Sequence, residues 1–284
     1  MRLFRLCLLF VLISCGNNTN QKTTSVPFEL TGQGHILIKA TVNGVEGNFI
    51  FDTGAGLNMF FKTFAQKING QNLKRFFIAH RSTGEPIKAS LYKSGEIVLG
   101  GDVYTDYDYT NVDFDIPGLD GILSLQMFID TDVTIDYNKK ELIFGDVTGK
   151  NQLASIDIQI ADYAGNALDI FTMVKIDDST NAQVMLDAGA GAGVYWLNRD
   201  LMDTLKFNFE EFVITEKESD FAPGHKNTFY KGQIQSISSP IARIERPDVT
   251  FVDGLIYEGK FSIDWLGKVI AISLKDKKIY QLDK

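Results

Sequence analysis

The feature that most constrains this 284-residue chain is an internal repeat. A shift of 135 residues places Ile36–Asp52 over Phe171–Asp187 without a gap, and each copy continues from its aspartate into a run of small residues. Two later landmarks recur in the same order. A shift of 133 places 120–123 over 253–256, and a shift of 137 places 133–142 over 270–279. Three landmarks at nearly one spacing predict two similar lobes, residues 26–148 and 152–284.

Each half has the pattern of a β-rich domain. Apolar and polar residues alternate with a period of two in many short segments, such as 35–42 and 133–137, which is typical of half-buried strands. Turn-forming dipeptides such as Asn43-Gly44 separate these segments. Only two short segments, 60–68 and 198–205, favour helices. The predicted fold class is therefore mostly β.

Composition excludes several classes of function. The net charge of −8 argues against a nucleic-acid binder, which needs a cationic surface. Three histidines and two cysteines are too few and too scattered for the usual zinc or iron–sulfur ligand sets. We therefore expect no metal and no cofactor. A content of 44% hydrophobic residues provides the material for a packed core.

The N-terminus has the pattern of a targeting signal. Residues 1–14 combine Arg2 and Arg5 with a short apolar run, which is typical of a signal peptide. The run ends at Cys15 in a sequence that resembles the bacterial lipobox, and residues 15–25 form a polar tether. We expect lipidation of Cys15 and attachment to the bacterial cell envelope, in the periplasm or at the outer membrane. The alternative is an ordinary signal peptide with an incidental cysteine.

Removal of the signal peptide would leave no free thiol. Cys7 lies inside the predicted signal, and Cys15 would carry the lipid. Cysteine-peptidase and thioredoxin-like chemistry both need a thiolate, so both are excluded for the mature chain.

The repeat places one aspartate in each half, after an apolar strand and before a glycine-rich turn. These are Asp52 and Asp187. Two such turns that meet face to face would bring the carboxyl groups together, where they would share one proton. A water between them could then attack an amide carbonyl. The alternatives are an Asx-turn cap at either aspartate and a phosphate-binding loop at 189–193.

The segment Phe49–Ala55 resembles the catalytic segment of the aspartic peptidases, the pepsin and retropepsin superfamily. Gly118–Leu123 is similar to a later segment of the same family. The resemblance extends over both halves and is closest to bacterial two-lobed aspartyl-protease-like lipoproteins. It implies two β-barrel-like lobes of the acid-protease fold with a cleft between them. It also implies a monomer, because one chain supplies both aspartates.

The resemblance assigns roles to individual residues. Asp52 and Asp187 match the catalytic pair. The residues expected to support this pair are Thr53, Gly54, Ala55, Ala188 and Gly189. The tip of the expected flap contains Thr83, Gly84 and Glu85. In the family, a hydroxyl beside each aspartate reaches across to the backbone of the opposite lobe.

The chain departs from the family pattern at three places. Ala188 replaces a hydroxyl residue, so we expect only half of the reciprocal clamp, with Thr53 accepting the amide hydrogen of Ala188. Ser124 and Tyr257 stand where the family has glycine, and we expect Tyr257 to reshape the site near Asp187. The flap, with strands near 73–80 and 87–92, has no tyrosine at its tip.

These observations lead to one main hypothesis and one alternative. The main hypothesis is an aspartic-type endopeptidase that hydrolyses peptides or proteins with Asp52 and Asp187. The alternative is a degenerate relative that binds peptides or envelope partners without cleaving them. The three histidines are interpreted as surface or hydrogen-bonded residues. His80, at the foot of the expected flap, is the only one that would merit mutation.

Overall fold

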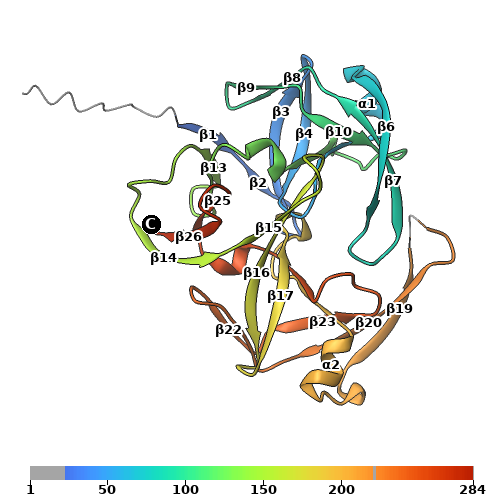
Figure 1. Cartoon of the computed structure of the whole chain (residues 1–284), viewed down its shortest axis with the longest axis vertical. Coiled ribbons are helices and arrows are strands. Elements are labelled where there is room, and N and C mark those ends of the chain that lie inside the picture. Colours follow the sequence, from blue (N-terminus) through green and yellow to red (C-terminus); the bar gives the residue numbers. More distant parts are fainter. Residues whose placement is uncertain (1–22, 220–221, 284) are drawn as a thin grey trace, which may run out of the picture.

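The computed structural model describes residues 23–219 and 222–283. The predicted signal peptide and Cys15 lie outside these residues. The described chain is mostly β, as the sequence predicts (Figure 1). Its two α-helices, α1 (Lys62–Ile68) and α2 (Asp200–Leu205), each begin two residues later than the predicted helical segments. No helix of the described residues is long and apolar enough to cross a membrane.

The first half of the chain forms a ten-stranded sheet. Its strands are β2 (Glu29–Leu30), β3 (Ile36–Val42), β4 (Val45–Asp52), β5 (Asn58–Phe60), β6 (Gln71–His80), β7 (Pro86–Lys93), β8 (Glu96–Leu99), β9 (Asp102–Thr105), β10 (Asp108–Asn111) and β11 (Gly121–Ser124). Bonded neighbours follow the order β6-β7-β10-β5-β11-β4-β3-β8-β9, and β2 pairs with β3.

The second half forms a sheet of the same design. Its strands are β15 (Gln159–Asp162), β16 (Leu168–Ile176), β17 (Thr180–Leu186), β18 (Tyr195–Asn198), β19 (Val213–Glu218), β20 (Lys226–Gln233), β21 (Ser236–Ser238), β22 (Arg243–Glu245), β23 (Asp248–Val252) and β24 (Gly259–Phe261). The order β19-β20-β23-β18-β24-β17-β16-β21-β22, with β15 beside β16, repeats the first sheet strand for strand. The repetition seen in the sequence thus extends to the sheet topology.

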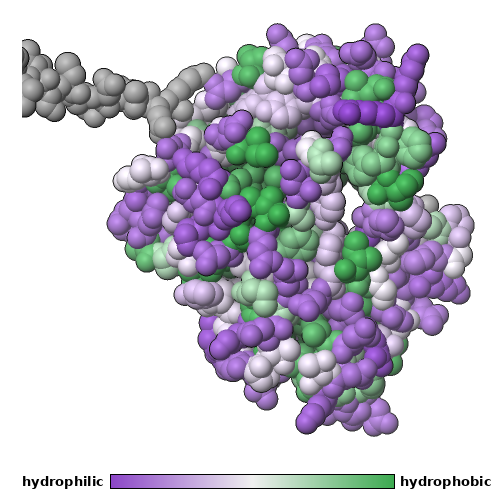
Figure 2. All heavy atoms as spheres, viewed as in Figure 1, coloured by the Kyte–Doolittle hydropathy of each residue, from purple (hydrophilic) through white to green (hydrophobic). Residues whose placement is uncertain are grey.

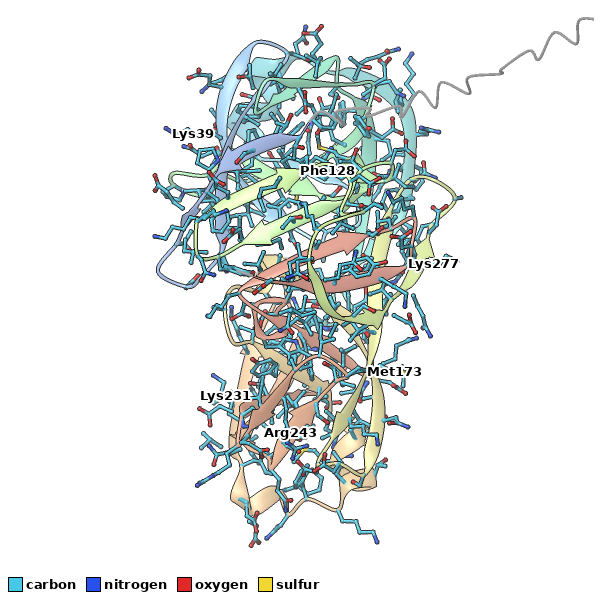
Figure 3. The ribbon with its side chains drawn as sticks, turned by 90° about the vertical axis from the view of Figure 1, so that its left-hand side faces the viewer. Lys39, Phe128, Met173, Lys231, Arg243 and Lys277 are labelled. Carbon is cyan, nitrogen blue, oxygen red and sulfur yellow. The ribbon has the colours of Figure 1, made fainter. Side chains whose placement is uncertain are left out.

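A third sheet joins the two halves. It contains β1 (Thr24–Pro27), β12 (Val133–Asp136), β13 (Glu141–Phe144), β14 (Gln152–Asp157), β25 (Val269–Ser273) and β26 (Lys278–Leu282). The order is β1-β13-β12-β25-β26-β14, so each half contributes three adjacent strands. At its centre β12 pairs antiparallel with β25, with Thr134 opposite Ala271. Figure 3 looks onto this sheet, with the green strands of the first half beside the red strands of the second.

Val147, Val269, Ala271 and Leu282 form a small apolar cluster of their own. The main core is a larger continuous cluster that includes residues of all three sheets. It contains Phe51 of β4, Phe128 next to β12, Leu186 of β17 and Ile272 of β25, all at most 1% exposed. Polar side chains cover most of the face shown in Figure 2, and the apolar residues there form small separate groups. Strands with alternating burial, such as β3, explain the period of two in the sequence.

The structure corrects two of the sequence alignments between the halves. Gly259, and not Gly254, corresponds to Gly121: β11 pairs in parallel with β4 and β24 with β17, and each of these two glycines begins its strand. The true shift is therefore 138 instead of 133. The segment 253–256, aligned from the sequence, forms a turn before β24. The β3–β4 turn has two residues and the β16–β17 turn three, so β3 and β16 are offset by one residue from the gap-free alignment.

Candidate active site

The two aspartates of the repeat lie at equivalent strand ends. Asp52 is the last residue of β4, and Asp187 directly follows β17. Each of these strands is bonded on both sides, β4 by β3 and β11 and β17 by β16 and β24. Strands held in this way fix the backbone at the point where each aspartate projects.

The carboxyl group of each aspartate lies against the glycine turn of the other half. A Cβ atom on Gly54 would collide with the Asp187 carboxyl group, and a Cβ atom on Gly189 would collide with that of Asp52. Asp52 Oδ1 accepts hydrogen bonds from Gly54 N at 2.7 Å and from Gly189 N at 3.2 Å. Only glycine permits this approach, and the two turns therefore meet face to face.

Thr53 ties the two turns together. Its buried Oγ1 accepts a hydrogen bond from Ala188 N at 2.9 Å and donates one to the carbonyl oxygen of Leu186 at 2.8 Å. The hydrogen bond from Ala188 is the one that the sequence predicted. The methyl side chain of Ala188 cannot form the reciprocal pair, so the clamp is one-sided.

A lysine that the sequence analysis missed lies beside the second aspartate. Lys260 Nζ is 2.7 Å from Asp187 Oδ2, and only 15% of the lysine side chain is exposed. The ammonium group also lies 5.0 Å from the centre of the Trp196 ring. The equivalent residue of the first half is Ile122, because Ile122 follows Gly121 as Lys260 follows Gly259.

The sequence analysis missed Lys260 because it aligned Gly121 with Gly254 instead of Gly259. Asp120 Oδ2 accepts a hydrogen bond from Asn48 N, and Glu258 Oε2 accepts one from Gln183 N. An acidic residue followed by glycine is therefore the signal common to both halves, and Glu258-Gly259 would have located Lys260.

The same correction changes the assignment of Tyr257. By strand register, Ser262 follows β24 at the place that Ser124 occupies at the end of β11. Both serines are fully buried. Tyr257 precedes β24 and lines the cavity described below, so it does not replace a family glycine.

The two aspartates differ in charge. Burial raises the pKa of Asp52 well above its ordinary value, and the charge of Asp187 adds to this effect. Burial acts in the same direction on Asp187, but the ammonium group of Lys260 opposes it strongly, and the pKa of Asp187 lies below its ordinary value. The site thus favours a charged Asp187 and a protonated Asp52. Asp187 Oδ1 is buried without a hydrogen-bond partner among the described residues.

The β6–β7 hairpin is the segment expected to form the flap, and its residues 77–80 line one cavity with Gly54 and Gly56 of the Asp52 turn. Its tip contains Thr83, Gly84 and Glu85, and it is docked onto the second half of the chain. The carbonyl oxygen of Thr83 accepts a hydrogen bond from Asn227 Nδ2 at 3.2 Å and lies 3.2 Å from His225 Nε2. Thr83 and Glu85 are buried as a result.

A cavity of about 390 Å³ lies between the hairpin and the aspartate turns. Its lining residues are Gly54, Gly56, Leu57, Phe77, Ile78, Ala79, His80, Tyr163, Asn166, Ala167, Asp169, Ile256 and Tyr257. The molecular surface is hollowed beside the hairpin, at the right-hand side of the view in Figure 2. His80 is an exposed lining residue of this cavity.

His35 lies closer to the aspartates than the sequence indicated. A Cβ atom on Gly191, four residues after Asp187, would come within 3.1 Å of the His35 ring. Burial lowers the pKa of His35, although the charge of Asp187 acts in the opposite direction. His35 is therefore a half-buried neighbour of the site and not a surface residue remote from it.

Residues 38–131 match the aspartyl protease family. The matched segment contains Asp52, the flap and β11, and it supports the aspartic peptidase superfamily for this part of the chain. Asp187 and Lys260 lie outside it. No curated protein matches the chain.

Proposed function

We propose that this chain is an aspartic-type endopeptidase in which Asp52 and Asp187 activate a water molecule. The observation that carries the proposal is the reciprocal approach of each carboxyl group to the glycine turn of the opposite half. The match of residues 38–131 to the aspartyl protease family supports it. In this proposal residues 26–148 and 152–284 are the two lobes of an acid-protease fold, and the peptide lies in the cleft between them.

The charges of the two aspartates assign their roles. Asp187, held ionised by Lys260, removes a proton from the water as its oxygen attacks the amide carbon. Asp52 donates its proton to the carbonyl oxygen, which gives a neutral tetrahedral diol. Collapse of the diol breaks the C–N bond: Asp187 passes the proton that it took from the water to the leaving nitrogen, and Asp52 recovers a proton from a diol hydroxyl. In this proposal the water becomes a hydrogen-bond partner of the two carboxyl groups, which lie against each other in the structure.

The proposal includes the location of the enzyme. The signal-like residues 1–14 and the lipobox-like site at Cys15 support attachment to the bacterial cell envelope by a lipid. The presence of both aspartates in one chain supports a monomer. Labelling of Cys15 with a radioactive fatty acid, and its loss in Cys15→Ala, would test the anchor.

Digestion of a mixed peptide library between about pH 3 and 8 tests the activity. The Asp52→Asn protein is measured in parallel, with its melting temperature as a control for folding. We expect cleavage by the wild type and none by the variant, at nearly equal thermal stability. Cleavage by a folded Asp52→Asn protein would rule out the pair of aspartates.

Two observations favour a second candidate function, a peptide-binding protein without activity. The ammonium group of Lys260 occupies one oxygen of Asp187, and Ala188 leaves the clamp one-sided. The variant Ala188→Thr discriminates between the candidates, because a degenerate site would gain activity and a working enzyme would change little.

A further inference from the structure

Among the buried carboxyl groups of the described residues, Asp169 differs from the others because it forms no ion pair. Five acidic side chains are buried: Glu85, Asp132, Asp136, Asp169 and Asp187. Four of them have a cationic nitrogen within 4.0 Å, from Arg81, Lys275, Lys139 and Lys260, respectively. No lysine, arginine or histidine of the described residues forms an ion pair with Asp169, which is 6% exposed.

The groups around Asp169 hold it in place without neutralising it. Tyr163 Oη donates a hydrogen bond to Asp169 Oδ2 at 3.1 Å, and the Tyr257 hydroxyl is a second polar neighbour. Two phenols orient a carboxylate but do not cancel its charge. A buried carboxylate without a cation is costly, and burial accordingly raises the pKa of Asp169 to about 6.

Asp169 lies on the cavity under the hairpin, next to the aspartate pair. The same cavity is lined by Gly54 and Gly56, which follow Asp52, and by apolar side chains of Leu57, Phe77, Ile78 and Ile256. Its volume of about 390 Å³ is large enough for one long side chain. Apolar walls with one buried anion suit a ligand with an aliphatic stem and a cationic end.

We propose that this cavity is a subsite for the side chain of a lysine or arginine of the bound peptide, with Asp169 as the partner of its cation. The proposal rests on the proposed function, because that function places an extended peptide in the cleft. Asp169 is then a specificity-determining residue, and Tyr163 and Tyr257 position its carboxylate.

The test measures binding, so that it does not depend on cleavage. The purified protein is titrated at pH 7.5 with N-acetyl-lysine methylamide and with N-acetyl-norleucine methylamide, which has nearly the same stem and no charge. The shifts of the Ala167 and Leu168 amides are followed by NMR. We expect the lysine probe to bind at least about tenfold more tightly than the norleucine probe.

Two variants complete the experiment. Asp169→Asn should remove the preference for lysine, whereas Asp162→Asn should retain it. Asp162 is the last residue of β15, in the same hairpin as Asp169 of β16. It is exposed, lies outside the cavity and undergoes the same change of charge. Equal binding of the two probes to the wild type, or a lysine preference that persists in Asp169→Asn, would overturn the proposal. A lysine preference without cleavage of any peptide would overturn the proposed hydrolysis and support the subsite.

Discussion

At the scale of single residues, Lys260 is the feature that separates the two halves most clearly. It lies 2.7 Å from Asp187, whereas Ile122 stands at the corresponding place near Asp52. A cation on one side of a carboxyl pair decides which carboxyl group is ionised. The pair is therefore asymmetric before any substrate binds.

Replacing Lys260 with methionine should shift the acidic limb of the pH profile upward. The lysine lowers the pKa of Asp187, so its loss raises that pKa and protonates Asp187 at a higher pH. We expect the limb of kcat/KM to move by about one pH unit or more. Lys175→Met, on an exposed position of β16, is the matched control and should leave the limb in place. An unchanged limb in Lys260→Met would contradict this role.

The raised pKa of Asp169 leads to a prediction about the pH dependence of the free energy of unfolding. Its pKa in the folded protein is raised to about 6 from an ordinary value of 3.8. The folded state therefore holds a proton that the unfolded state releases, and this contribution to stability is complete below pH 3.8 and is lost as the pH rises through about 6. We expect Asp169→Asn to be more stable than the wild type at pH 8, by up to about 3 kcal/mol, and the difference to shrink towards pH 4. Denaturant unfolding at the two pH values measures it, and a difference that grows on acidification would be the wrong sign.

At the scale of elements, the flap hairpin is held by a small set of hydrogen bonds from the second half. Asn227 Nδ2 donates to the carbonyl oxygens of Thr83 and Asp253, and Ile256 N donates to that of Ser82. Movement of the hairpin tip away from the second half would require the bonds to Thr83 and Ser82 to break.

The variant Asn227→Ala should loosen the hairpin tip. Loss of a hydrogen bond of about 1 kcal/mol corresponds to about a fivefold change in an opening equilibrium. The amide of Gly84, bonded to Arg81 O within the tip, should exchange with deuterium about fivefold faster. Asn151→Ala, at an exposed position far along the chain, is the control. Exchange at an unchanged rate would show that the docking does not depend on Asn227.

Some elements and site residues could be predicted from the sequence, and others could not. The mostly β class, the flap segment, the positions of Asp52 and Asp187 and the hydrogen bond from Ala188 to Thr53 could all be predicted, since each follows from a local pattern or its repetition. Lys260 could not be found by a uniform shift, because three more residues separate Asp187 from Gly259 than separate Asp52 from Gly121. Asp169 was missed for a different reason: its burial depends on the loop between β15 and β16 packing against Gly56, a contact remote in sequence.

At the scale of the whole molecule, one core and one shared sheet join the two halves. The apolar cluster is continuous from Phe51 to Ile272, and β12 and β25 are hydrogen-bonded along their lengths. Separation of the halves would expose this core and break the central sheet. We therefore expect the two halves to unfold together as one thermodynamic unit.

Thermal unfolding should accordingly show one cooperative transition. In differential scanning calorimetry we expect the calorimetric and van't Hoff enthalpies to agree. Two resolved transitions, assigned to the halves by limited proteolysis, would contradict this prediction.

Ile122 and Lys260 occupy corresponding positions in the two halves, and this difference is possible only because one chain contains both halves. A site assembled from two identical subunits must carry every residue twice, so a lysine beside one aspartate would bring a second lysine beside the other. Two cations would then ionise both carboxyl groups, and no proton would remain to be donated. A single chain that contains both copies has no such constraint. It can place a charged residue, Lys260, beside one aspartate and an aliphatic residue, Ile122, at the corresponding place near the other.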